Sequence, residues 1–140
     1  MKMRLVFLFI ALLVVFFSNC TSQNSLCNFS KTQSQTSYDN LVEAVLMKKS
    51  CGATTSDSYH LFLHSVGDKI DMDAPVFVAD KVQSLNISWV DADQLLISYE
   101  SARIFQFTNF RDVNQSGALR RVITIIEKQH LIHPSHPIKK

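Results

Sequence analysis

Two histidines, four residues apart, carry the side chains best suited to chemistry in this chain. His60 and His64 lie in the alternating segment 59–64. Alternate residues of a β-strand share one face, so both imidazoles should lie on the face that also carries Phe62. They would stand about 13 Å apart along the strand, too far to hold one ion without a further ligand. We therefore expect solvated strand histidines, with a transition-metal site as the alternative.

Three more histidines recur near the end of the chain. His130, His133 and His136 occupy every third position. In polyproline II geometry this spacing places them on one side of the backbone. A weak zinc or copper site is one interpretation and a plain polar tail is the other. The sequence predicts no bound cofactor.

Hydroxyl and carboxylate side chains in the turns offer no complete catalytic arrangement. The threonines lack a nearby base, and each carboxylate pair has too few oxygen ligands for calcium. We predict turns with satisfied hydroxyls and carboxylates, no catalytic residue and no small-molecule substrate. These side chains are Thr54, Thr55, Asp71, Asp73, Asp91 and Asp93.

Residues 1–19 have the composition of a secretory signal peptide. Lys2 and Arg4 precede an unbroken apolar run over residues 5–17. As a helix this run would be about 20 Å long, whereas the hydrocarbon core of a bilayer is about 30 Å thick. A basic start and an apolar stretch of this length are typical of a leader removed on export. An uncleaved membrane anchor is the alternative.

Cys20 follows the leader at the position of the lipid-modified cysteine of a bacterial lipoprotein. Phe17 and Ser18 fit that pattern, whereas Asn19 replaces the usual small residue. We expect acyl chains such as palmitate on Cys20, and several such chains hold a protein on a membrane. The alternative is cleavage by ordinary signal peptidase after Cys20, with Ser18 and Cys20 as the small residues at the site.

Cys27 and Cys51 remain as an even pair once Cys20 is acylated or removed. In an oxidising compartment we expect them to form a disulfide. The bond would close a loop of about 25 residues and contribute roughly 3.5 kcal/mol by restricting the unfolded chain. Two unpaired buried thiols are the alternative. A metal site is disfavoured because neither cysteine belongs to a C-x-x-C pair.

The chain that follows the leader is formally neutral. The net charge of +2 equals the charge of Lys2 and Arg4. No run of basic residues and no basic patch interleaved with aromatic residues occurs after them. Nucleic acid is therefore not an expected partner.

Residues 39–128 carry the pattern of an antiparallel β-domain. Short segments of alternating hydrophobicity are separated by polar turns, one of them at 50–57 with Gly52 available for positive φ. We predict a mainly β fold, an antiparallel meander of about six short strands arranged as a curled sheet or a small sandwich. The expected strands cover residues 41–47, 59–64, 75–79, 85–90, 95–99, 103–107 and 118–128.

Some boundaries of this domain are less regular. Residues 20–38, rich in Ser, Thr, Gln and Asn, are predicted to be a lipid-anchored polar stalk. Pro75 suggests that strand 75–79 lies at a sheet edge. Residues 110–117 are predicted to be a polar connection. Residues 118–128 also fit a helical stripe, but their β-branched side chains favour a strand, and residues 129–140 are predicted to be a loose tail.

A Cys-Gly-Ala-Thr-Thr turn at residues 51–55 lies between an apolar strand and an alternating strand. The segments 75–80, 87–89 with its central tryptophan, and 93–99 follow in order. Across residues 38–108 this series resembles an uncharacterised family of small bacterial secreted and lipid-anchored β-domains. The resemblance implies a β fold, export and a bacterial source. It implies no catalytic residues, because no activity is assigned to that family.

The sequence thus predicts a non-enzymatic lipoprotein of the bacterial cell envelope. We expect it on the periplasmic side of the outer membrane, held by its N-terminal lipid and presenting a β-surface or a sheet edge to another envelope protein. A soluble periplasmic or secreted binding module is one alternative. A weak histidine-based metal-binding protein, or a metal-dependent enzyme, is the other.

Overall fold

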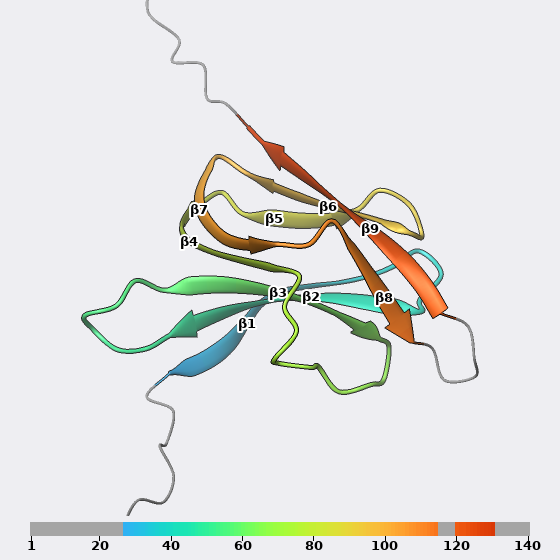
Figure 1. Cartoon of the computed structure of the whole chain (residues 1–140), viewed down its shortest axis with the longest axis horizontal. Helices are drawn as coiled ribbons and strands as arrows, with labels where there is room; N and C mark the ends of the chain where they lie inside the picture. The colour runs from blue at the N-terminus through green and yellow to red at the C-terminus, as the bar shows by residue number, and fades with distance from the viewer. Residues whose placement is uncertain (1–26, 115–119, 131–140) are drawn as a thin grey trace, which may run out of the picture.

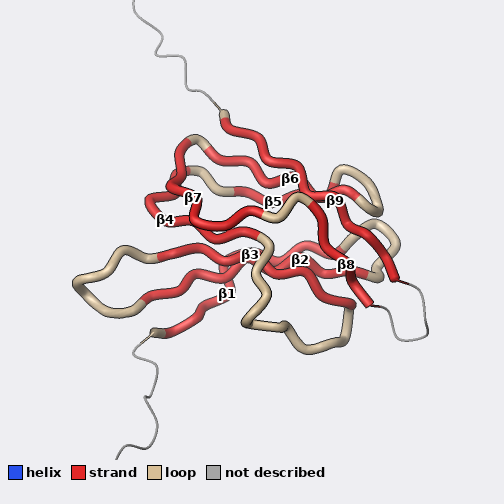
Figure 2. Tube along the Cα trace, in the orientation of Figure 1, coloured by secondary structure: helices blue, strands red, loops and turns tan. Residues whose placement is uncertain are grey.

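The described part of the chain is built from β-strands. The structure, a computed structural model, describes residues 27–114 and 120–130. All regular elements in these ranges are strands, which confirms the predicted mainly β fold class (Figure 2). The strands are β1 (Asn28–Thr36), β2 (Val42–Ser50), β3 (Ser58–Ser65), β4 (Phe77–Gln83), β5 (Asn86–Trp89), β6 (Gln94–Tyr99), β7 (Ser101–Phe107), β8 (Phe110–Asn114) and β9 (Arg120–Gln129).

The strands form two sheets that pack as the layers of a small sandwich (Figure 1). Sheet A has the order β1-β2-β3-β4-β7, and each neighbouring pair in it is antiparallel. Sheet B has the order β5-β6-β9-β8, in which β6 and β9 are parallel. The predicted antiparallel meander therefore runs through sheet A, whereas β9 returns from a distance to lie between β6 and β8.

One long hairpin, residues 77–107, contributes to both sheets. β4 pairs with β7 in sheet A, and β5 pairs with β6 in sheet B, so each arm of the hairpin bends once between the layers. At the bend the Glu100 N–H donates to the Gln83 carbonyl over 3.0 Å. Ser84 takes a left-handed φ of 55° at the same corner. Such corners allow one segment to serve both layers of a sandwich.

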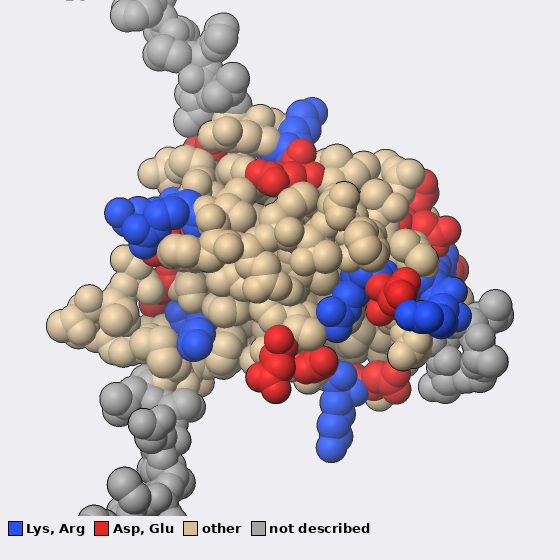
Figure 3. Space-filling view, in the orientation of Figure 1, with Lys and Arg blue, Asp and Glu red and all other residues tan. Residues whose placement is uncertain are grey.

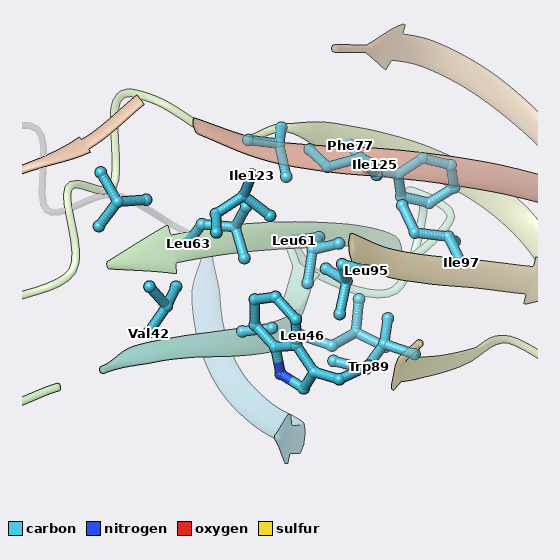
Figure 4. Close-up of a cluster of buried hydrophobic side chains, with 14 of the residues drawn as sticks. Val42, Leu46, Leu61, Leu63, Phe77, Trp89, Leu95, Ile97, Ile123 and Ile125 are labelled. Atoms are coloured by element: carbon cyan, nitrogen blue, oxygen red, sulfur yellow. The ribbon is translucent and has the colours of Figure 1, made fainter. Parts of the chain in front are cut away.

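The hydrophobic core lies between the sheets (Figure 4). Leu61 and Phe77 of sheet A point toward Ile97 and Ile123 of sheet B, and all four side chains are fully buried. Trp89 fills the space beside them and is 6% exposed. Burying a large aliphatic or aromatic side chain contributes about 1.5–3 kcal/mol, so these contacts dominate the stability of the sandwich.

Strand β1 occupies part of the segment for which the sequence predicts a polar stalk. Residues 28–36 pair with β2 along their length, with one irregularity between Lys31 and Gln33. An edge strand needs backbone partners more than apolar side chains, and β2 supplies the buried surface. The β-domain therefore begins before residue 39, where its start was expected.

Two other sequence expectations are corrected. Residues 110–114 form β8 in place of a polar connection, because the neighbouring β9 provides the apolar partners for this short strand. β4 lies inside sheet A although Pro75 suggested an edge. Pro75 precedes the strand, and the Val76 N–H already donates to the Leu61 carbonyl over 2.8 Å, so the proline removes no bond from the ladder.

Strand β9 confirms the strand expected at 118–128. Ile123 and Ile125 are buried, whereas Val122 and Ile126 are exposed on the other face. This strict alternation is the strand period and excludes a helical stripe. β9 continues to Gln129, so the predicted loose tail starts no earlier than the next residue; residues 131–140 lie outside the described residues.

Side chains from β1 and the following turn close the free edge of β5. The Gln33 amide donates to the Ile87 carbonyl over 3.0 Å and accepts from the Ile87 N–H over 3.3 Å. The Trp89 indole donates to the Gln35 carbonyl, and the Tyr38 hydroxyl donates to the Trp89 carbonyl, each over 3.0 Å. We call this contact the β1–β5 seam. It satisfies polar groups that an edge strand otherwise leaves open.

Candidate functional site

Cys27 and Cys51 form a disulfide, as the sequence predicts. The bond joins the start of β1 to the residue after β2, next to the paired residues Asn28 and Ser50. It therefore fastens the edge strand to the rest of sheet A. Cys20 lies outside the described residues, and its acylation stays a prediction.

His60 is packed in an aromatic cluster on the outer face of sheet A. Its ring meets Phe29 edge-on with centroids 5.4 Å apart and stacks on Phe62 at 6.3 Å. The Ser58 hydroxyl lies 3.0 Å from Nε2. Burial of the imidazole, helped by the Lys49 ammonium, lowers the pKa of His60. The folded protein thus favours a neutral ring at this position.

His64 lies further along β3, beside a carboxylate of β2. Its Nε2 is 3.4 Å from Glu43 Oε2, and its Nδ1 is 2.9 Å from the Ser65 carbonyl oxygen. The side chain is only 10% exposed. Its contacts with Glu43 and with the Ser65 carbonyl differ from those of His60, so the two rings do not form a joint site.

The predicted histidine-based metal sites gain no ligand set from the described residues. Among residues 27–114 and 120–130, no three His, Cys, Asp or Glu side chains converge on a position for a cation. The His130 N–H donates to the Tyr99 carbonyl over 2.7 Å at the end of β9. His133 and His136 lie outside the described residues, so the proposed tail site stays untested.

The paired carboxylates stabilise turns. Asp71 Oδ1 accepts from the Asp73 N–H over 3.1 Å, and Asp91 Oδ1 accepts from the Asp93 N–H over 2.8 Å. Aspartates commonly bond in this way to the backbone two residues on. The Thr55 hydroxyl likewise donates to the Gly52 carbonyl over 3.3 Å.

Arg121 joins three segments that are distant in the sequence. Its guanidinium donates to Asp39 in the β1–β2 turn and to Asp93 in the β5–β6 turn. Asp39 also accepts from the Ser37 hydroxyl over 2.7 Å and from the Leu41 N–H over 3.3 Å. We call this group the Arg121 junction. Sequence reasoning missed it because 82 residues separate Asp39 from Arg121 and no local pattern links them.

We expect the Arg121 junction to make stability depend on acid. The hydrogen bonds from the Ser37 hydroxyl and from Arg121 lower the pKa of Asp39 from 3.8 to about 2. A carboxyl with a lower pKa in the folded state stabilises the fold above its unfolded pKa, and this stability is lost as the pH falls toward 2. Because the Asp39 side chain is 32% exposed, solvent screening leaves a contribution of about 1–2 kcal/mol.

Urea unfolding of Asp39→Asn and of the unchanged chain, at pH 7 and at pH 2, measures this effect. The variant should be less stable by that amount at pH 7, and the difference should shrink at pH 2. Asp73→Asn, in an exposed turn without an ion pair, is the matched control. An equal difference at both pH values would show that the charge of Asp39 is not the cause.

A cavity of about 230 Å³ lies between the end of β3, the β3–β4 loop and β8. The Ser65 hydroxyl closes one end by donating to the Asn114 carbonyl over 2.5 Å. Positive and negative side chains surround the opening. On the face shown in Figure 3, basic and acidic groups stand side by side in this part of the molecule. The lining residues are Leu63, His64, Ser65, Asp68, Lys69, Asp71, Arg111, Asp112, Val113 and Asn114.

Arg111, which lines this cavity, differs from the other arginines of the described residues. Arg103, Arg120 and Arg121 each form an ion pair with an aspartate. Arg111 has no carboxylate partner within the described part of the chain, and it is half-buried. It occupies the same face of β8 as the core residue Val113, which places it at the mouth of the sandwich. A half-buried guanidinium without an anion is a candidate binding group.

A second cavity of the same volume lies beside the β1–β5 seam. Its lining is uncharged: Thr32, Gln33, Leu46, Tyr59, Val82, Ser84 and Leu85. The Thr32 hydroxyl and the Gln33 amide already bond to backbone groups. This cavity therefore offers less for specific recognition than the one beside β8.

The outer face of sheet B exposes apolar side chains. Phe110 of β8 is 56% exposed, and Val122 and Ile126 of β9 are 53% and 40% exposed. Phe110 pairs with Thr124, so Val122 and Ile126 flank it diagonally on the same face. Neighbouring exposed apolar groups of this kind mark interaction surfaces in soluble domains.

Comparisons of the chain with protein-family profiles, with curated proteins and with solved structures find no match. Within the described residues, no helix has the length and apolar character needed to cross a bilayer. The class is therefore defined by the structure alone: a two-sheet β-sandwich fastened by the Cys27–Cys51 disulfide, with a charged cavity beside an edge strand.

Proposed function

We propose that the chain is a non-enzymatic lipoprotein of the bacterial envelope whose β-sandwich binds another envelope protein. The Cys27–Cys51 disulfide is the observation that carries the proposal. Disulfides of this structural kind persist in oxidising compartments and are rare in the reducing cytosol. The bond is therefore consistent with the leader of residues 1–19 and with export.

The position of the disulfide also fits a lipid anchor. Cys20 precedes Cys27 by only seven residues, a span of at most about 25 Å when fully extended. Acyl chains on Cys20 would hold the sandwich close to the membrane, on the periplasmic side of the outer membrane in our proposal. The resemblance to small bacterial lipid-anchored β-domains points the same way.

Two surface features support an interaction role. The outer face of sheet B carries the exposed side chains Phe110, Val122 and Ile126. The edge of β8 adjoins the charged cavity that contains Arg111. An apolar patch and an accessible strand edge are features through which β-domains bind other proteins.

The mass of the mature N-terminus tests the anchor. We expect the first residue to be Cys20 carrying acyl chains, and we expect Cys20→Ser to move the protein from the membrane fraction to the soluble fraction. Asn19→Gly, which restores the usual small residue, should keep the membrane location. An unmodified N-terminus at Thr21 would instead identify a soluble periplasmic or secreted module. A chain that still begins at Met1 would contradict export with cleavage.

A metal titration tests the histidine alternative. Tight, stoichiometric zinc or copper binding that is lost in His60→Ala would favour a metal site over the interaction role. The packing of His60 between Phe29 and Phe62 gives no reason to expect such binding.

A further inference from the structure

We propose that the free edge of β8 and the adjoining cavity bind an extended peptide segment that carries a carboxylate. The peptide backbone would pair with β8, and the carboxylate would meet Arg111. This inference rests on the proposed interaction role and specifies its site and the chemistry of its partner.

The backbone of β8 has unpaired groups on the side away from β9. The Ile125 N–H donates to the Asn109 carbonyl over 2.7 Å, so the backbone N–H and C=O groups of residues 109, 111 and 113 point toward β9 in the alternating antiparallel pattern. The backbone groups of Phe110, Asp112 and Asn114 point to the opposite side, where the Asn114 carbonyl accepts from the Ser65 hydroxyl. Within residues 27–114 and 120–130, the N–H and C=O groups of Phe110 and Asp112 have no hydrogen-bond partner, as required for the addition of a strand.

The two edge strands of sheet B, β5 and β8, differ in how far side chains bond to their backbone groups. At β5, the Gln33 amide and the Tyr38 hydroxyl bond to the backbone and form the β1–β5 seam. At β8, by contrast, only the Asn114 carbonyl has such a partner among the described residues. Since proteins usually protect exposed strand edges, the open groups of β8 are a specific feature that suits a binding role.

The cavity beside this edge has room for part of a peptide. Its volume of about 230 Å³ lies below the roughly 300–1,000 Å³ of pockets for drug-sized ligands. The β3–β4 loop forms the wall opposite β8, with Asp68, Lys69 and Asp71 along it. A space of this size fits one or two side chains of a segment lying along β8.

Charge selects the group that enters the cavity. Arg111 is the arginine without an ion pair among the described residues, and a guanidinium forms its strongest hydrogen bonds with a carboxylate. Lys69 is a second cation at the cavity. Asp68, Asp71 and Asp112 also line it, and of these Asp112 is paired with Arg120, so the site as a whole would repel a polyanion. A single carboxylate on an otherwise neutral segment fits this balance.

Nuclear magnetic resonance titration of the full chain, expressed with its leader and labelled with ¹⁵N, tests the inference. The first probe is acetyl-Thr-Val-Glu-Val-Thr-amide, which presents a side-chain carboxylate. The second is acetyl-Thr-Val-Gln-Val-Thr with a free C-terminus, which presents a terminal carboxylate instead. The third, acetyl-Thr-Val-Gln-Val-Thr-amide, has neither. We expect saturable shifts of the Phe110 and Asp112 amides with one or both carboxylate peptides, and about 10-fold weaker binding of the third.

Two changes separate the parts of the proposed contact. Arg111→Gln should weaken binding of the carboxylate peptides about 10-fold and leave the neutral peptide unaffected. N-methylation of alternate amides in the best probe removes its backbone donors without altering the protein, and it should abolish binding. Lys128→Gln, which removes a positive charge from an exposed position of β9 outside the cavity, is the control and should bind as the unchanged chain does.

The outcomes are distinct from those of the anchor experiment. Absence of shifts with every carboxylate peptide would overturn the inference, as would binding that is insensitive to Arg111→Gln or to N-methylation. An acylated Cys20 found together with no peptide-induced shifts in β8 would leave the lipoprotein proposal in place. Peptide binding by a protein with an unmodified N-terminus would support the peptide site at β8 and reject the lipid anchor.

Discussion

Replacing Trp89 with alanine is expected to lower the free energy of unfolding by about 3–5 kcal/mol. The indole is 6% exposed and packs in the core between the sheets. Its N–H also donates to the Gln35 carbonyl over 3.0 Å. Alanine would therefore leave a cavity and remove a hydrogen bond of the β1–β5 seam at the same time. Urea unfolding followed by far-ultraviolet circular dichroism measures the loss without relying on the tryptophan signal.

Trp89→Phe separates the hydrogen bond from most of the packing. Phenylalanine keeps an aromatic ring in the core but has no donor for the Gln35 carbonyl, so we expect a cost of about 1–2 kcal/mol. Val90→Ala, at the neighbouring exposed position, should change stability by less than about 0.5 kcal/mol. If alanine at Trp89 cost no more than phenylalanine, the packing of the indole described above would be wrong.

Removing the disulfide with the pair Cys27→Ser and Cys51→Ser is expected to lower the free energy of unfolding by roughly 3.5 kcal/mol. The two cysteines are 24 residues apart, so the bond restricts a long loop of the unfolded chain. β1 depends on it most, because this edge strand is polar and buries little apolar surface of its own. Guanidinium unfolding with and without a reducing agent measures the same contribution in the unchanged chain.

The two disulfide measurements control each other. Reductant should weaken the unchanged chain to the level of the double variant and should leave the double variant unaltered. Cys20→Ser should leave the unfolding free energy unchanged, because the disulfide joins Cys27 to Cys51 and does not include Cys20. A double variant as stable as the unchanged chain would show that the bond does not constrain the fold.

Strands with a clear two-residue period could be predicted from the sequence. Residues 85–90 alternate between apolar and polar types, and residues 95–99 were expected as their hairpin partner. The structure has β5 and β6 at these positions. β9 was recognised from its β-branched residues, although its parallel pairing with β6 was not. Pairing partners at long range leave no mark in a local pattern, because the period of a strand is the same whatever its neighbour.

The missed strands, β1 and β8, share one property. Residues 28–36 consist mainly of Ser, Thr, Gln, Lys and Asn, and residues 110–114 contain only two apolar side chains. Both strands lie at sheet edges, where backbone pairing to a more apolar neighbour supplies the stability. Composition alone therefore predicted a stalk and a connection in their place. The role of the Gln33 side chain in β1 depends on the β5 backbone that it contacts, which no local pattern shows.

The candidate sites were predictable only in part. The disulfide followed from counting cysteines, since Cys20 had a separate explanation. The positions of His60 and His64 on one face of a strand also followed from spacing, but the aromatic packing of His60 did not. The special status of Arg111 could not be predicted, because it depends on which arginines elsewhere find an aspartate in the folded chain. That distribution of ion pairs is a property of the tertiary structure.

The position of β9 has a consequence for the order in which the strands can pair during folding. β9 lies between β6 and β8, so neither strand gains this neighbour until the final strand has been inserted. A chain exported with its amino terminus first would release β6 well before β9 follows. During that interval sheet B would present unfilled edges to other proteins, which is the situation in which chains aggregate or engage chaperones. Sheet A, whose first four strands pair in sequence order, would meanwhile be free to assemble as it emerges.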